Sequence, residues 1–191
     1  MDLQHGVFLI SLDFELYWGL RDKKSIEQYQ NNLLGVTNSI RETLRIFTDH
    51  VIYATWATVG FLFFENLDDL KGDLPAILPK YKKEDLSPYK YIAESVNLKS
   101  EYHVAKDLIS TIQKCKGQEI GTHTFSYYYC LEEGQTISEF EADITSAIQI
   151  AKSNEIYLNG IVFPRNQFNL EYLYILNKLG IMSRKRIKLD I

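Results

Sequence analysis

Gly121-Thr122-His123-Thr124-Phe125-Ser126-Tyr127-Tyr128-Tyr129-Cys130 is the strongest functional signal in this chain of 191 residues. It follows the short approach Glu119-Ile120, which places His123 just past the end of an expected strand, with hydroxyl side chains on either side. In open α/β folds, ligands and metal ions are usually held where strands end. The segment therefore predicts a binding site that includes His123.

A second signal lies about a hundred residues earlier, where the apolar run Val7-Phe8-Leu9-Ile10-Ser11-Leu12 ends in Asp13-Phe14-Glu15. The run shows no polar alternation, which predicts a strand buried on both faces. Asp13 and Glu15 are separated by one residue, and in an extended chain such side chains point to the same side. The two signals together predict a pocket of carboxylates and an imidazole.

Strand and helix patterns alternate along the rest of the chain, which favours parallel βαβ units. Further strands are expected at residues 51–57, 119–122 and 160–163 and from Ile181 onward. Helices are expected at residues 25–47, 60–66, 102–114, 136–151 and 170–179. Five strands are too few for a complete eight-stranded barrel. The predicted fold is α/β, an incomplete or irregular (β/α) barrel of parallel strands with flanking helices.

The chain is expected to form a single domain over residues 1–191, with one long interruption. Residues 67–90 contain Pro75, Pro79 and Pro88 and the charged run 80–85, which indicate a surface excursion. Such a loop either carries binding residues or is a tolerated insertion.

Composition excludes several classes of protein. The net charge of −4 and the pI near 5.6 do not suggest a nucleic-acid or membrane-surface protein. Cys115 and Cys130 do not form a Cys-x-x-Cys pair, so we expect two inert thiols and a reducing compartment. The longest apolar stretch, residues 51–64, is too short to span a bilayer, and the first residues do not resemble a secretory signal. A soluble cytoplasmic protein is the default expectation.

Polar side chains follow three of the expected strands: Asp13 and Glu15, His123, and the group that begins with Arg165. The carboxyl ends of parallel strands lie at the same edge of a sheet, so these residues should converge. A carboxylate and an imidazole can hold a divalent metal, which lowers the pKa of bound water. A second carboxylate could act as general base, and an arginine would keep it ionised. A carboxylate and a histidine for a metal, a second carboxylate as base and an arginine beside it are the groups needed for metal-assisted hydrolysis of an amide or ester.

Four segments of the sequence resemble successive motifs of the polysaccharide deacetylases, the NodB-homology group of carbohydrate esterase family 4. They are Leu9-Ile10-Ser11-Leu12-Asp13-Phe14-Glu15, Thr55-Trp56-Ala57-Thr58-Val59-Gly60, Glu119-Ile120-Gly121-Thr122-His123-Thr124-Phe125-Ser126 and Val162-Phe163-Pro164-Arg165. The resemblance covers roughly residues 7 to 182. It implies an irregular (β/α) barrel and a metal, usually zinc, used to remove N- or O-acetyl groups from glycans.

The resemblance also implies roles for individual residues. Asp13 takes the place of the catalytic base, and Arg165 that of the arginine that holds this base. Glu15 takes the place of the carboxylate metal ligand, and His123 that of the first histidine ligand. The partner is then a carbohydrate substrate or glycan; the oligomeric state is not predicted.

Three departures from the family pattern stand beside the resemblance. Tyr127 occupies the position of the second histidine ligand, and tyrosine is a poor zinc ligand because its phenol, with a pKa of about 10, must ionise first. Glu15 stands where many members have aspartate. The late histidine of the family, its general acid, has no counterpart before Ile191. A divalent metal, zinc by resemblance, is therefore expected to be weakly held if at all, and the last strands of the family to be missing.

These observations leave alternatives open. The first is metal-dependent deacetylation of an acetylated sugar or surface-polysaccharide precursor, impaired in this chain. The second is a non-catalytic glycan- or protein-binding descendant of the fold, and the third is a fragment of a longer enzyme. The run Tyr127-Tyr128-Tyr129 could stack on sugars, although core packing is the favoured interpretation.

Overall fold

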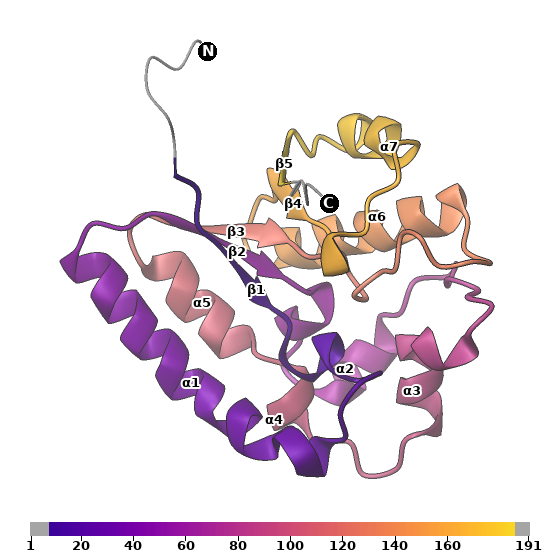
Figure 1. Cartoon of the computed structure of the whole chain (residues 1–191), viewed down its shortest axis with the longest axis horizontal. Coiled ribbons are helices and arrows are strands. Elements are labelled where there is room, and N and C mark those ends of the chain that lie inside the picture. Colours follow the sequence, from indigo (N-terminus) through magenta and orange to yellow (C-terminus); the bar gives the residue numbers. More distant parts are fainter. Residues whose placement is uncertain (1–7, 186–191) are drawn as a thin grey trace, which may run out of the picture.

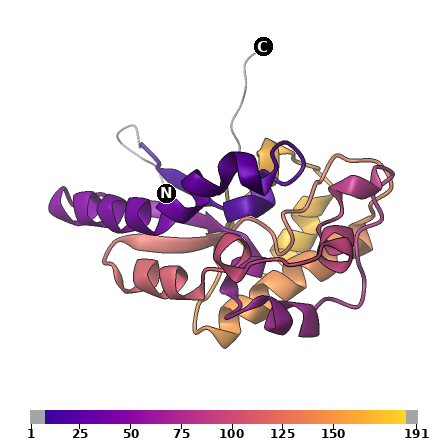
Figure 2. The same ribbon diagram turned by 90° about the horizontal axis from the view of Figure 1, so that it is seen from below.

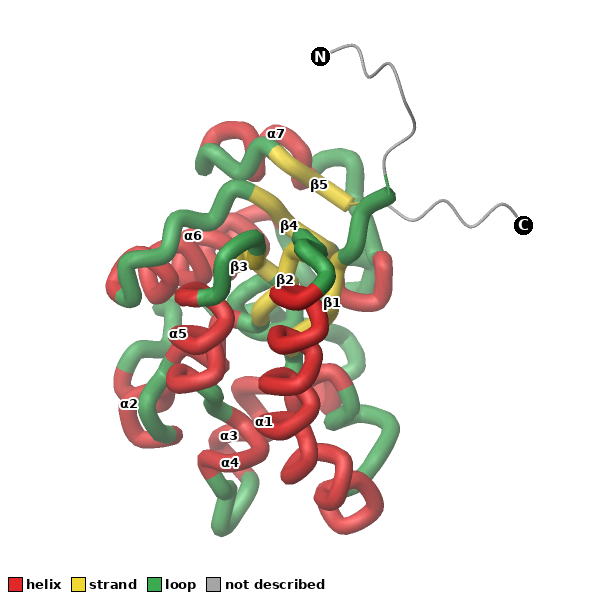
Figure 3. Tube along the Cα trace, turned by 90° about the vertical axis from the view of Figure 1, so that its left-hand side faces the viewer, coloured by secondary structure: helices red, strands yellow, loops and turns green. Residues whose placement is uncertain are grey.

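The computed structural model describes residues 8–185, which build a five-stranded sheet with helices packed around it (Figure 1). Strands that follow one another in the chain are neighbours in the sheet, in the order β1-β2-β3-β4-β5, and each neighbouring pair is parallel. Such a sheet twists and curls, and Figure 3 shows the strands as a curved row from β1 to β5. The predicted α/β fold with an incomplete barrel is confirmed.

The strands are short, and their register determines which side chains meet at the carboxyl edge. They are β1 (Ser11–Phe14), β2 (Ala54–Thr58), β3 (Gln118–Thr122), β4 (Gly160–Val162) and β5 (Ser183–Lys185). Asp13 lies opposite Ala57, which in turn lies opposite Gly121. Glu15 and His123, each two residues further along their chains, therefore leave the sheet at the same edge.

The helices alternate with the strands as expected. They are α1 (Ile26–Asp49), α2 (Leu67–Gly72), α3 (Pro88–Glu94), α4 (Ser100–His103), α5 (Lys106–Lys114), α6 (Ile137–Ser153) and α7 (Tyr172–Lys178). Single 3-10 turns follow the ends of three strands and precede α3: η1 (Leu16–Gly19), η2 (Gly60–Phe63), η4 (Pro164–Asn166) and η3 (Glu84–Leu86).

The two long helices begin where the sequence predicts. Ser25 and Gln28 form a capping box at the start of α1, and Thr136 and Glu139 form one at the start of α6. Figure 2 shows α1, the long violet helix, lying along one side of the strands. In Figure 1, α5 lies beside α1, whereas α6 and α7 lie near β3 to β5.

The interior is formed by apolar side chains that the helices direct toward the sheet. Buried residues of three helices supply much of it: Leu33, Ile40, Leu44, Ile109, Ile112, Phe140, Ile144 and Ala147. None of the helices within residues 8–185 is both long and apolar enough to cross a bilayer.

The first strand corrects one expectation. The sequence predicts a strand buried on both faces at residues 7–12, of which Val7 lies outside the described residues. Phe8 and Leu9 are 88% and 72% exposed, and β1 begins only at Ser11. Phe8 and Leu9 precede the first residue of β1 that pairs with β2, and β1 has no strand on its other side because it lies at the edge of the sheet.

Two helix predictions are also wrong in detail. Of residues 60–66 only Gly60–Phe63 are helical, as the 3-10 turn η2. Asn66, expected near a helix end, instead caps the start of α2 by accepting from Asp68 N and Asp69 N. Residues 102–114 divide into α4 and α5 at Val104. The excursion expected at 67–90 includes α2 and buries Tyr81 in the core.

Candidate metal centre

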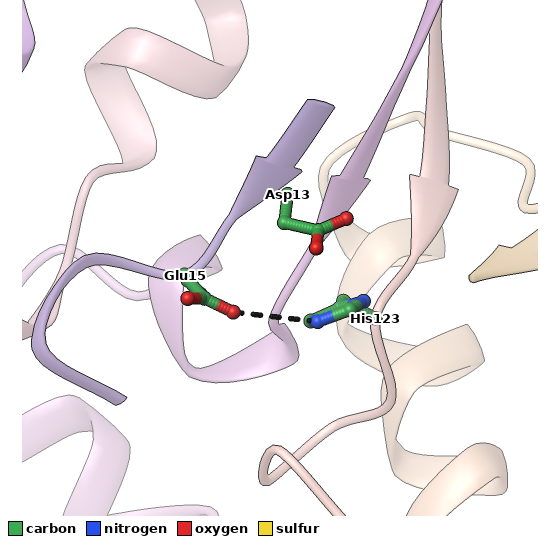
Figure 4. A group of neighbouring side chains, drawn as sticks. All are labelled: Asp13, Glu15 and His123. Atoms are coloured by element: carbon green, nitrogen blue, oxygen red, sulfur yellow. Dashed lines mark ion pairs between the residues drawn. The ribbon is translucent and has the colours of Figure 1, made fainter. Parts of the chain in front are cut away.

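Asp13, Glu15 and His123 converge at the carboxyl edge of the sheet, as Figure 4 shows. One potential ligand atom from each lies within 4.8 Å of those of the other two. The Glu15 Oε2 atom is 3.4 Å from His123 Nε2. Asp13 belongs to β1, and the other two residues directly follow β1 and β3. Three of the four residues predicted for the site are thus brought together.

The orientation of the His123 ring follows from its partners. Nδ1 is 2.8 Å from the carbonyl oxygen of Val162, which can only accept, so Nδ1 carries the proton and donates it. In this tautomer Nε2, the atom that faces Glu15, is the nitrogen that is available to a metal ion. A backbone acceptor on the far nitrogen is the arrangement that fixes histidine ligands of metals.

The Nε2 atom of His123 is the strongest sign that this site fits a cation. It is buried and has no hydrogen-bond partner among the described residues. A buried nitrogen lone pair that faces a carboxylate is unfavourable unless a proton or a metal ion lies between them. Two carboxylates and one imidazole are a donor set that suits a divalent ion. The residues present therefore fit a divalent metal.

The segment that carries His123 is buried at every position from Gly121 to Cys130. Its backbone groups accordingly find partners inside the protein: His123 N donates to Thr58 O at 2.9 Å, and Thr124 O accepts from Gly60 N at 2.9 Å. Thr124 has φ 67°, in the left-handed region that residues with a side chain seldom adopt. The packed surroundings hold His123 in one place.

Asp143 of α6 holds the next part of this segment, and sequence reasoning missed it. Its carboxylate accepts from Phe125 N at 2.7 Å, from Ser126 N at 3.1 Å and from Ser126 Oγ. Burial raises the pKa of Asp143 to about 6, although these three hydrogen bonds act in the opposite direction. The sequence does carry one signal for it: Asp143 lies on the same face of the helix as the apolar residues Phe140 and Ala147. An acidic side chain is seldom buried on such a face unless it has a hydrogen-bond partner.

Tyr127 occupies the position where the resemblance places a second histidine. Its ring centroid is 5.4 Å from that of His123, and its side chain is buried. Burial and then the charge of Glu15 raise the pKa of Tyr127, so its phenol stays neutral. Tyr128 and Tyr129 are buried as well, which confirms the prediction that this run packs in the core.

Arg165, the fourth predicted residue, has a partner that the sequence did not indicate. Its guanidinium forms an ion pair with Asp22, in the segment between η1 and α1, instead of the expected contact with Asp13. It also lies over the ring of Tyr129, 4.8 Å from the centroid. No local pattern could reveal this pair, because 143 residues separate its members.

His103 and the two cysteines lie outside the site. The His103 ring is buried, donates to Lys99 O at 2.7 Å and accepts from the Tyr91 hydroxyl at 2.9 Å. Burial lowers its pKa, so it is a neutral structural histidine. Burial also raises the pKa of Cys130 well above its usual value, as expected for an inert thiol. Cys115 is partly exposed, and neither cysteine forms a disulfide within the described residues.

No protein-family model matches the sequence, and no curated protein matches it. Solved structures do share its fold. A Mycobacterium smegmatis protein assigned as a polysaccharide deacetylase has a TM-score of 0.59 at 13% identity, over 92% of this chain and 49% of that one. A de-N-acetylase from Aggregatibacter actinomycetemcomitans has a TM-score of 0.57 at 12% identity, and the match covers 96% of this chain and 64% of that one.

A third structure is a mutant of a Bacillus anthracis CE4 family pseudoenzyme with restored enzymatic activity, with a TM-score of 0.54 at 14% identity. The match covers 93% of this chain and 43% of that one. The chain thus spans less than two thirds of the length of each of these structures. At such identities the likeness concerns the fold, and the chain has the NodB-type fold of the CE4 polysaccharide deacetylases.

Proposed function

We propose that this protein is a metal-dependent hydrolase that removes acetyl groups from an acetylated sugar or a surface-polysaccharide precursor, with slow turnover. The observation that carries the proposal is the cluster of Asp13, Glu15 and His123, in which the buried Nε2 atom faces the Glu15 carboxylate and has no hydrogen-bond partner among the described residues. The fold shared with carbohydrate esterase family 4 proteins supports the choice of an acetylated carbohydrate as substrate.

Each residue has a role that follows from its position. Glu15 and His123 would hold the metal, zinc by the resemblance, because their ligand atoms face each other and their side chains are the less exposed ones. A divalent ion held there would polarise an acetyl carbonyl and lower the pKa of a water molecule. Asp13 is exposed at the rim and accepts the proton of the attacking water.

Arg165 would act indirectly, without contacting the reacting atoms. Its ion pair with Asp22 joins the loop after β4 to the segment that precedes α1, and its guanidinium covers Tyr129. We assign it a positioning role, in which it fixes the two loops that border the cluster. This replaces the direct contact with Asp13 that the sequence suggested.

Slow turnover follows from the composition of the site. Among the described residues the cluster holds one imidazole, and the neutral phenol of Tyr127 stands where a second would be a ligand. Within residues 8–185, no second histidine lies in the cluster to deliver a proton to the leaving amine. Weak metal binding and slow departure of the amine are the consequences.

The test is acetate release from N-acetylated oligosaccharides after chelator treatment and addition of zinc, manganese or cobalt. We expect slow release that depends on the added metal and is lost in His123→Ala. The matched control is His103→Gln, which alters a buried histidine outside the cluster. Absence of acetate with every metal, in the wild type and in Tyr127→His alike, would overturn the catalytic proposal.

Tyr127 also favours a second candidate, a non-catalytic glycan-binding protein that retains the fold. The variant Tyr127→His separates the two. It supplies a second imidazole beside His123, so an impaired enzyme should gain metal affinity and acetate release. A binding protein should show no acetate release with or without the change, but should still bind acetylated oligosaccharides in a calorimetric titration.

A further inference from the structure

The carboxylate of Glu15 lies where a side chain of Gly19 would be. A Cβ atom built on Gly19 would lie 1.9 Å from Glu15 Oε1, 2.0 Å from Cδ and 2.6 Å from Oε2. These separations are far below any van der Waals contact, so the carboxylate could not keep its place beside a residue larger than glycine.

The chain reaches this arrangement through a tight turn at the end of β1. Leu16, the first residue of the 3-10 turn η1, has φ 45°, in the left-handed region. Trp18 N donates to Glu15 O at 3.0 Å, which closes the turn. The turn thereby brings Gly19, four residues after Glu15, next to the Glu15 carboxylate.

The same turn is anchored, so Gly19 itself cannot readily move aside. The indole Nε1 of Trp18 donates to His103 O at 2.8 Å, and this side chain is fully buried against Phe61, with ring centroids 4.8 Å apart. The hydroxyl of Tyr17 donates to Lys24 O at 2.8 Å. Of the two groups in contact, the end of the Glu15 side chain is the one that is free to shift.

The backbone of Gly19 does not require glycine. Its φ is not in the positive range, unlike that of Gly117, Gly134 and Gly180. Alanine can therefore adopt this conformation, and the need for glycine arises from the space that the carboxylate occupies.

We infer that Gly19 is a positioning residue of the metal centre, which holds the Glu15 carboxylate 3.4 Å from His123 Nε2 by leaving room for it. This inference rests on the metal-binding part of the proposed function and deepens it. A side chain at position 19 would push the carboxylate away from His123 and remove one of the two principal ligands, while the turn and the sheet remain in place.

The experiment compares Gly19→Ala with Gly35→Ala. Gly35 lies in α1, and a Cβ there would meet no atom within 4 Å in the described part of the chain. Metal affinity is measured by calorimetric titration with Zn²⁺ and Mn²⁺, and the fold is monitored by circular dichroism. Gly19→Ala should weaken metal binding by about 10- to 100-fold, the range for groups that orient a ligand. Gly35→Ala should leave the affinity unchanged.

A second arm needs neither metal nor substrate. In metal-free protein, a crystal structure of Gly19→Ala should show the Glu15 carboxylate displaced from His123 Nε2 while η1 keeps its place, and the melting temperature should change little because the displaced group is the end of a side chain. A carboxylate that stays beside Nε2, or a displaced η1, overturns the inference. If the wild type releases no acetate or binds no metal, the proposed function fails, and this arm still decides the role of Gly19.

Discussion

Asp13 is the exposed member of a cluster whose histidine is fully buried. Its position permits two roles, as a base or as a third ligand, and our account assigns the first. We predict that Asp13→Asn lowers acetate release by about 100-fold or more, because a positioned base contributes on that order. Metal affinity, measured by titration of the same variant, should change little. A parallel loss of affinity and activity would show instead that Asp13 ligates the metal.

Asp143 gives the protein a pH-dependent term in its stability. Burial raises the pKa of Asp143 to about 6 in the folded state, above the ordinary value of 3.8 that applies to the unfolded chain. Below pH 4 the group is protonated in both states and this term is at its most favourable. Between pH 4 and 6 the unfolded state ionises first, so the free energy of unfolding falls as pH rises, by about 3 kcal/mol in all.

The corresponding measurement is urea denaturation of the wild type and Asp143→Asn at pH 4.5 and pH 7. Asparagine cannot ionise, so the stability advantage of the wild type over the variant should shrink as pH rises. An advantage that is the same at both pH values would contradict the raised pKa of this carboxyl group.

Sequence analysis finds the site residues that directly follow a recognisable strand. Asp13, Glu15 and His123 follow apolar strands, and parallel strands end at one edge. Asp22 is different, because its relation to Arg165 depends on how two loops meet in space. Gly19 is different again, since its role concerns the space taken by a neighbouring side chain.

Among the secondary-structure elements, the turn after β2 has no room for a side chain at its first residue. A Cβ on Gly60, the first residue of η2, would lie 2.4 Å from Phe125 Cδ2 and 2.8 Å from its Cα. Phe125 cannot retreat, because its backbone N–H is bound to Asp143 and its carbonyl accepts from Phe61 N. We predict that Gly60→Ala lowers the free energy of unfolding by about 1–3 kcal/mol, the usual cost of overpacking.

Gly35→Ala is the control for this substitution in chemical denaturation. Its added methyl group meets open space on α1 in the described part of the chain, and the change from glycine to alanine in a helix should stabilise the protein by about 0.5–1 kcal/mol. Equal effects of the two substitutions would mean that the contact between Gly60 and the segment of His123 is not tight.

The start of a helix could be predicted where the capping residue fits only that position. The capping residues Ser25 and Thr136 mark the starts of α1 and α6 because they satisfy the free backbone N–H groups of each helix. Asn66 is ambiguous, since asparagine occurs both at helix starts and after helix ends. The exposure of Phe8 and Leu9 could not be predicted, because an apolar run does not reveal which strand lies at a sheet edge.

At the scale of the whole molecule, one property of the sheet creates the site. All its strands are parallel and in register, so the ends of β1 and β3 deliver their side chains to a common edge although about a hundred residues separate them. β2, which lies between them, places the small side chain of Ala57 in register with Asp13. The order of strands along the chain could be predicted from their alternation with helices, and the register could not.

The measurement that tests this account most directly is calorimetric titration of chelator-treated protein with Zn²⁺ and Mn²⁺, for the wild type and His123→Ala. We predict one ion bound per chain in the wild type, and loss of binding in the variant, because His123 Nε2 is a ligand. No binding by the wild type, or the same affinity in both proteins, would contradict the claim that Asp13, Glu15 and His123 form a metal centre.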